Sequence, residues 1–281
     1  MMGLRGTDGA VLCGALEMGG HRRRCWIATW PACPPAKRAT VLQIAKETAM
    51  ATQQKPELLF LHALPLDGSM WAGQKDLLPG ATHMPNLYPF GDSVQAWAAA
   101  ALSLVTGNRL IVVGCSVGGS CAIEVAVAAP ERIAALVLIG TKAAHRPDPA
   151  LHASALGIIR DQGLDHAWAR FWSPLFSRAA SSAVIGDARR AALRQSPRDV
   201  ARGVTAFHSR PSRDQFLAAF PRPVIIVTGA EDRMPGPEAS AAQARSTPQG
   251  RLHIVQDCGH YVPLERPGPL NLILRDLIAA R

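Results

Sequence analysis

The sequence lacks the features that mark several large classes of protein. It has no uninterrupted apolar run near the roughly 18 to 20 residues that cross a bilayer, so we expect no membrane association. Its six cysteines form no CxxC pair and no metal-ligand spacing, which favours free thiols in a reducing cytoplasm and no metal site. Aromatic residues make up 5% and hydrophobic residues 48% of the 281 positions. This composition excludes a disordered, collagenous or coiled-coil protein and predicts a globular one.

Lysine is also scarce, with five of the 30 basic residues. The net charge of +9 would suit a nucleic acid or an anionic surface as partner. However, residues 1–49 contribute +4 of this charge, and the remainder is scattered, mostly as arginine. Because no basic stripe with interleaved aromatic residues is present, we expect no nucleic-acid partner.

Residues 1–49 lack a sustained helical or strand period, a signal-peptide pattern and any serine, and the last point argues against a transit peptide. Our hypothesis is that they are a non-structural extension translated from upstream sequence, and that Met50 is the natural start. Lys46-Glu47 can be encoded by AAG GAG, a bacterial ribosome-binding sequence, at a suitable spacing before Met50. The gene sequence would test this hypothesis directly.

From Met50 onward, apolar runs alternate with helical patterns. The expected strands are residues 58–61, 82–87, 109–115, 133–140, 223–228 and 251–255. The expected helices between and after them are residues 93–105, with Ser93 as N-cap, 117–129, 237–245 and 270–280. This alternation predicts an α/β fold with a doubly wound, mostly parallel sheet and a ligand site at the carboxyl ends of the strands.

Residues 142–221 break the alternation, since they contain helix-like pieces and no good strand. The expected helical pieces are residues 149–160, 164–176, 181–195 and 197–207. We therefore predict an inserted helical cap over residues 142–221 and a core formed by residues 50–141 and 222–281.

The strongest chemical motif is Gly114-Cys115-Ser116-Val117-Gly118, which matches G-x-S-x-G between an expected strand and an expected helix. A nucleophile on so sharp a turn has strained backbone angles, and a side chain two residues before or after it would collide with neighbouring backbone. Ser116 would thus stand exposed at the top of the sheet as a nucleophile. The N–H of Val117, at the helix N-terminus, would point towards developing negative charge.

A serine hydroxyl needs a base and a group that orients the base, in the chain order serine, acid, histidine. Asp232 follows the expected strand at 223–228, and His260 follows the last expected strand. We expect His260 to remove the Ser116 proton and Asp232 to hold the imidazole. Asp232 can instead be only a turn residue, with Glu231 or Asp257 as the acid.

A second oxyanion donor is expected in the loop His62-Ala63-Leu64-Pro65-Leu66, which follows the first strand. Leu64 N–H is the candidate that would act with Val117 N–H, because Pro65 has no N–H to donate. We interpret His62 as a residue that braces this loop by hydrogen bonding, not as a second base.

Four blocks, LFLHALPLDGSMW, GCSVGG, GAEDRMPGPEAS and DCGHYVPLERP, resemble the corresponding blocks of the α/β-hydrolase superfamily. The resemblance covers about residues 57–281 and is to the small esterases and lactonases, with enol-lactonase-like and carboxylesterase-like proteins as the nearest group. It implies the α/β-hydrolase fold, and with residues 1–49 absent it implies a sheet of about six strands. Two departures are Ala63 in place of the usual glycine and residues 86–91 in place of the usual Asp-x-x-Gly-x-Gly.

The expected substrate-binding residues are large apolar side chains of the cap and of the loops near the catalytic residues. They are Trp71, Trp168, Trp172 and Val262. The alternative for each is that it only packs the cap against the core.

These observations predict a cytoplasmic serine hydrolase that acts on a small carboxylic ester or lactone through an acyl-enzyme intermediate, with no metal or organic cofactor. A C–C hydrolase, a lyase or a perhydrolase-type haloperoxidase can carry the same residues. A hydrolase-fold ligand-binding protein with little turnover is the alternative from another class.

Overall fold

The computed structural model describes residues 55–280, which belong to one compact unit, Met50–Arg281. Our hypothesis on residues 1–49 therefore lies outside the described residues and stays a prediction.

A sheet of six strands, parallel throughout, forms the centre of this unit, in the order β2-β1-β3-β4-β5-β6. The strands are β1 (Glu57–Leu61), β2 (Thr82–His83), β3 (Leu110–Cys115), β4 (Ile133–Ile139), β5 (Val224–Gly229) and β6 (Gly250–Val255). The inner strands β1, β3, β4 and β5 are almost wholly buried, as continuous apolar runs predict for a parallel sheet covered on both faces. β2 is shorter than the expected 82–87, because Pro85 cannot donate to a strand ladder.

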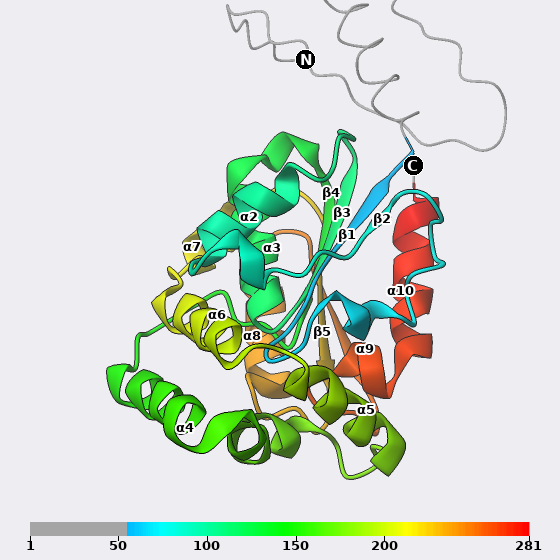
Figure 1. Cartoon of the computed structure of the whole chain (residues 1–281). Coiled ribbons are helices and arrows are strands. Elements are labelled where there is room, and N and C mark those ends of the chain that lie inside the picture. Colours follow the sequence, from blue (N-terminus) through cyan, green and yellow to red (C-terminus); the bar gives the residue numbers. More distant parts are fainter. Residues whose placement is uncertain (1–54, 281) are drawn as a thin grey trace, which may run out of the picture. The chain divides into compact units, whose positions relative to one another are not determined.

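The strand order reverses between β1 and β3, which places the loops after these two strands at one crevice. Figure 1 shows α2 and α3 on one face of the sheet and α10 on the other. The helical elements outside the cap are η2 (Gly68–Trp71), η3 (Tyr88–Phe90), α2 (Val94–Leu102), α3 (Val117–Ala128), η4 (Pro130–Arg132), α8 (Gly236–Ser246), α9 (Val262–Glu265) and α10 (Pro267–Ala279). Ser93 Oγ accepts from Ala96 N–H at 3.2 Å, so the expected N-cap of α2 is confirmed.

Between β4 and β5 the described chain contains only helical elements, which we call the cap. They are α4 (Pro149–Ala167), the π-helical turn η5 (Trp168–Trp172), η6 (Ser173–Leu175), α5 (Ser182–Leu193), α6 (Pro197–Ser209) and α7 (Asp214–Ala219). The run labelled α4 is broken at Gly163, whose φ of 83° a residue with a side chain rarely adopts. The two helices expected over 149–160 and 164–176 are therefore both present, and the second continues from α4 into η5 and η6. In Figure 1, α4, α5 and α6 lie across the carboxyl ends of the strands.

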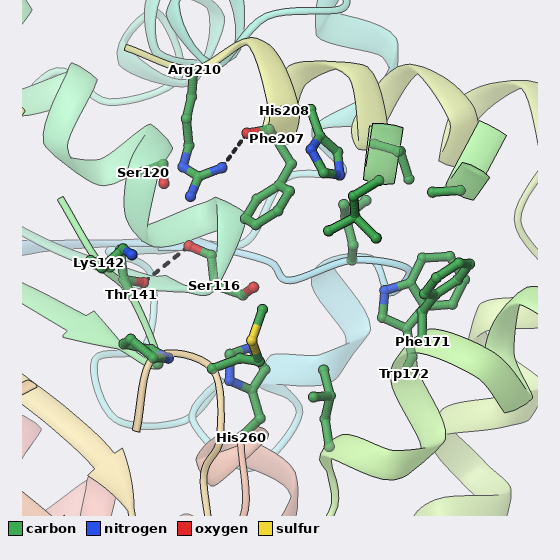
Figure 2. A pocket seen from close by; sticks show the side chains of 18 of the residues that line it. Ser116, Ser120, Thr141, Lys142, Phe171, Trp172, Phe207, His208, Arg210 and His260 are labelled. Atoms are coloured by element: carbon green, nitrogen blue, oxygen red, sulfur yellow. Dashed lines mark hydrogen bonds between the residues drawn. The ribbon is translucent and has the colours of Figure 1, made fainter. Parts of the chain in front are cut away.

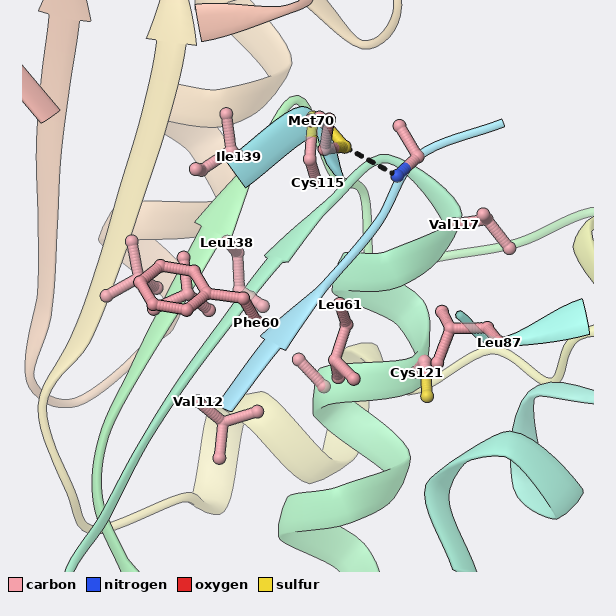
Figure 3. Close-up of a cluster of buried hydrophobic side chains, with 14 of the residues drawn as sticks. Phe60, Leu61, Met70, Leu87, Val112, Cys115, Val117, Cys121, Leu138 and Ile139 are labelled. Atoms are coloured by element: carbon pink, nitrogen blue, oxygen red, sulfur yellow. Dashed lines mark hydrogen bonds between the residues drawn. The ribbon is translucent and has the colours of Figure 1, made fainter. Parts of the chain in front are cut away.

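The core is built from apolar side chains on both faces of the sheet (Figure 3). Leu61 points to the face of the sheet that α3 covers, whereas Phe60 points to the opposite face, as strand alternation requires. Cys115, Cys121 and Cys258 are free and buried, which confirms the expected thiol state for these three. None of the helices described is both long and apolar enough to span a membrane.

Candidate active site

Ser116 occupies the turn between β3 and α3 with φ 55° and ψ −120°, a strained conformation for a residue with a side chain. The turn is closed by a hydrogen bond from Ser116 N–H to Ile139 O at 2.8 Å and by one from Thr141 Oγ1 to Ser116 O at 3.0 Å. A Cβ on Gly114 would lie 2.2 Å from Gly118 O, and one on Gly118 would lie 2.1 Å from Leu61 O. The expected steric requirement for glycine at both positions is therefore confirmed.

His260 and Asp232 form a buried pair at the carboxyl ends of β6 and β5. His260 Nδ1 lies 3.1 Å from each carboxylate oxygen of Asp232, and both side chains are almost inaccessible to solvent. Met234 N–H also donates to Asp232 Oδ1, at 2.8 Å. Because the carboxylate accepts the Nδ1 proton, Nε2 of the neutral ring is left free to accept a proton.

The two alternative acids do not contact His260. Glu231 is exposed, and its Oε2 accepts from Arg178 N–H at 3.1 Å. The side chain of Asp257 is also exposed, and its backbone carbonyl accepts from Ser177 Oγ. Of the three carboxylates left open by the sequence, the geometry therefore selects Asp232.

The loop that carries His260 is held by Glu265, a residue whose role the sequence did not reveal. The buried Glu265 carboxylate accepts from Gly259 N–H at 3.1 Å and from Ser177 N–H, which belongs to the cap, at 3.0 Å. His260 N–H donates to Leu175 O of the cap at 2.8 Å. These bonds tie the position of the imidazole to the cap.

Leu64 and Val117, the predicted oxyanion donors, follow the adjacent strands β1 and β3. Among the described residues no acceptor is bonded to Leu64 N–H, and Val117 N–H, at the first position of α3, has no partner within the helix. Tyr261 Oη donates to Leu64 O at 3.0 Å, and Met70 Sδ accepts from Ala63 N–H at 3.2 Å (Figure 3). Both bonds hold the loop after β1, and neither was expected from the sequence.

His62 braces the same loop, as its sequence position suggested. Its Nε2 accepts from Leu87 N–H at 2.9 Å, so the ring proton is on Nδ1, which lies 3.2 Å from Ala63 O. Burial lowers the pKa of His62 to about 4.

A cavity of about 270 Å³ opens beside Ser116 and His260 (Figure 2). Among the described residues there is no hydrogen bond between Ser116 Oγ and His260, a contact that commonly tightens only when substrate binds. The cavity is bordered by apolar side chains of the cap, with polar groups at one end, and Leu64 is among its lining residues.

Of the four predicted substrate-binding residues, only Trp172 lines this cavity. Trp71 is fully buried with its ring centroid 4.9 Å from that of Phe60, so it belongs to the core. Trp168 packs against Phe176 at 6.0 Å between centroids, and Val262 is buried at the start of α9. For these three residues the alternative, packing of the protein interior, is what the structure shows.

The described residues contain no cluster of three or more histidine, cysteine or acidic side chains arranged to hold a metal ion.

The model of the alpha/beta hydrolase family matches residues 58–271 of the sequence. The chain belongs to this family. The family expected from the sequence blocks is thereby confirmed, and the six-stranded sheet with flanking helices agrees with it.

Individual relatives share about a quarter of their aligned residues with this chain. The pimeloyl-[acyl-carrier protein] methyl ester esterase of Aromatoleum aromaticum is 25% identical over 248 residues, spanning 80% of this chain and 98% of that protein. A 2-hydroxymuconate semialdehyde hydrolase of Pseudomonas putida is 25% identical over 64% of both chains. The solved structure of a thermophilic esterase from Thermogutta terrifontis matches with a TM-score of 0.68 and 26% identity, over 79% of this chain and 89% of that one.

The buried imidazole of His62 makes the stability of the hydrolase depend on pH. The unfolded histidine, with an ordinary pKa near 6.5, takes up a proton before the folded one does, so this contribution to stability is complete above pH 6.5 and is lost as the pH falls towards 4. We expect the free energy of unfolding to fall by about 2 kcal/mol between pH 8 and pH 5 through His62 alone. Urea unfolding of the wild type and of His62→Gln at the two pH values measures it.

The glutamine variant serves as the reference because it does not titrate and its side-chain oxygen can accept from Leu87 N–H. His208, whose pKa burial also lowers to about 4, contributes with the same sign in both proteins, so the difference between them isolates His62. Equal losses in the two proteins would contradict the assignment.

Proposed function

We propose that this protein is a serine hydrolase that cleaves a small carboxylic ester or lactone through an acyl-enzyme intermediate. The observation that carries the proposal is the position of Ser116, which stands on a strained turn and faces a cavity that His260 also lines. Nδ1 of His260 is hydrogen-bonded to the buried Asp232. The names of its relatives support the proposal, since two of the three compared above are esterases.

In this mechanism Ser116 Oγ attacks the ester carbonyl carbon while His260 Nε2 takes the hydroxyl proton. Asp232 keeps the ring in the required tautomer and stabilises the imidazolium. The negative charge that forms on the carbonyl oxygen is accepted by the N–H groups of Leu64 and Val117. When the tetrahedral intermediate collapses, His260 returns the proton to the leaving alkoxide.

Water then repeats the sequence on the acyl-enzyme. His260 removes a proton from the water as it attacks the ester carbonyl, and the proton passes to Ser116 Oγ as the acid is released. The cavity of about 270 Å³ lies at the small end of ligand pockets, which favours small molecules over polymers as substrates.

Labelling by a fluorophosphonate probe tests this proposal. We expect the wild-type chain to be labelled and to hydrolyse p-nitrophenyl acetate and butyrate, because the probe reacts with activated serines. We expect Ser116→Ala to lose both the label and the turnover while keeping its unfolding temperature. A folded wild type that neither labels nor turns over these esters would refute the proposal and favour a ligand-binding protein.

Hydrolysis of a C–C bond is the second candidate, and it is favoured by the similarity to the 2-hydroxymuconate semialdehyde hydrolase. The same serine, histidine and acid would serve. Turnover of a vinylogous 1,5-diketone that exceeds turnover of every ester tested would favour this candidate over ester hydrolysis.

A further inference from the structure

The two ends of the cavity differ in charge (Figure 2). Arg210, Ser120, Thr141 and Lys142 lie on one side of Ser116, and the aromatic rings of Phe171 and Trp172 lie on the other. The complete set of lining residues contains no aspartate or glutamate. The polar end therefore carries positive charge that the cavity wall does not balance.

Arg210 has hydrogen-bond donors without protein partners. It follows the last residue of α6, and its guanidinium stacks on the ring of Phe207 at 3.9 Å and donates from Nη1 to Phe207 O. Its Nε–H is buried and, among the described residues, meets no acceptor. An unsatisfied buried donor on a charged group is costly unless a ligand satisfies it.

The buried carboxylate of Glu124 pairs with Arg213 and not with Arg210. Glu124, on α3, forms a two-point ion pair with Arg213, at 2.7 Å to Nε and 2.9 Å to Nη2. The ion pairs of the described residues include none with Arg210 or Lys142. Burial lowers the pKa of Arg210 to about 10, so the guanidinium still carries its charge at pH 7.

We propose that the substrate is an ester or lactone that carries a free carboxylate, and that Arg210 binds this carboxylate while Ser116 attacks the ester carbonyl. The inference rests on the proposed function and specifies its substrate class. A planar guanidinium matches a carboxylate through two parallel N–H···O bonds, and Lys142 adds a second positive charge at the same end. The aromatic end then receives the apolar part of the substrate.

The test uses pairs of methyl esters that differ only in a terminal carboxylate or methyl group. Monomethyl glutarate is compared with methyl pentanoate, and monomethyl adipate with methyl hexanoate, by methanol release from the full chain and its variants. We expect Arg210→Gln to lower kcat/KM for the monoesters by about 10- to 100-fold, mainly through KM, because it removes a charge-assisted contact made throughout the reaction. We expect kcat/KM for the two neutral esters to change by less than about threefold.

Two further variants control for charge and folding. Arg251→Gln removes an exposed positive charge from β6 and is expected to change neither class of ester. Arg210→Lys keeps the charge without the planar fork, so it should lower kcat/KM for the monoesters alone and by a smaller factor. It also tests the site if Arg210→Gln does not fold. An equal loss on charged and neutral esters, or no loss on either, would overturn the inference.

A binding measurement separates this inference from the proposed function. Titration calorimetry with glutarate needs no turnover, and we expect Arg210→Gln to weaken glutarate binding at least tenfold relative to the wild type. If Ser116 fails to label but this difference is found, the proposed function fails and the anion site stands. If Ser116 labels and neutral esters are hydrolysed but glutarate binds both proteins alike, the hydrolase stands and the anion site is refuted.

Discussion

Replacing Ser116 with alanine is expected to lower kcat for p-nitrophenyl butyrate by about 10⁶-fold, and replacing His260 in addition is expected to lower it no further. The reason is that the hydroxyl and the imidazole act in one step. Without the nucleophile, the base has no proton to remove, so the two losses do not add. Steady-state kinetics of the two single variants and the double variant measure this non-additivity.

Substitution of two neighbouring carboxylates, Asp232 and Glu231, provides a matched comparison of their effects on kcat. Asp232→Asn should cost about 10⁴-fold in kcat, because an amide in contact with Nδ1 favours the wrong tautomer of His260. Glu231→Gln, a change of the same size one residue away at an exposed side chain, should leave kcat within about twofold. A double variant ten times slower than either single variant, or an equal loss in Glu231→Gln, would contradict the proposed arrangement.

Gly118→Ala is expected to lower the free energy of unfolding by about 4 kcal/mol or more. Its Cβ would lie 2.1 Å from Leu61 O, at the end of β1, and 2.6 Å from His62 O, in the loop that carries the proposed oxyanion donor. Relief of this overlap requires α3 to move away from β1, which breaks packing on the buried face of the sheet. Urea or thermal unfolding measures the loss.

Gly157→Ala is the control for the same chemical change. Gly157 lies in α4, and an added Cβ would meet no atom within 4 Å. Alanine in a helix interior is favoured over glycine by roughly 0.5–1 kcal/mol, so this variant should be slightly more stable than the wild type. If the free energy of unfolding changed by a similar amount in both variants, crowding at the Ser116 turn would not be the reason for glycine at position 118.

The sequence resolved those features that depend on local pattern. The buried strands were evident as apolar runs because a parallel sheet is covered on both faces, and the turn at Ser116 was evident because its glycines stand in a strand-turn-helix context. The break between the helices expected over 149–160 and 164–176 was evident too, and it lies at Gly163, whose backbone angles are not helical.

Contacts between distant segments were decided by the tertiary structure. Asp232, Glu231 and Asp257 are all acids near strand ends, and their burial and distance to His260 distinguish them. Tryptophan is a large apolar residue that suits a core and a pocket equally well. The sequence therefore could not distinguish Trp172, which lines the cavity, from Trp71, which packs on Phe60.

Thus the sequence by itself determined the family, the order of the strands and helices and the identity of the candidate nucleophile and base, because periodicity and turn chemistry are local properties of the chain. Only the tertiary structure decided which acid holds His260, which side chains border the cavity, and that Arg210 is one of them and has a buried Nε–H with no acceptor among the described residues. From the sequence alone, an arginine that follows a helix is predicted to be a solvated charge on the surface. Its role depends on burial and on the cavity that it lines together with residues more than 80 positions away, such as Ser116 and Ser120, which no local pattern encodes.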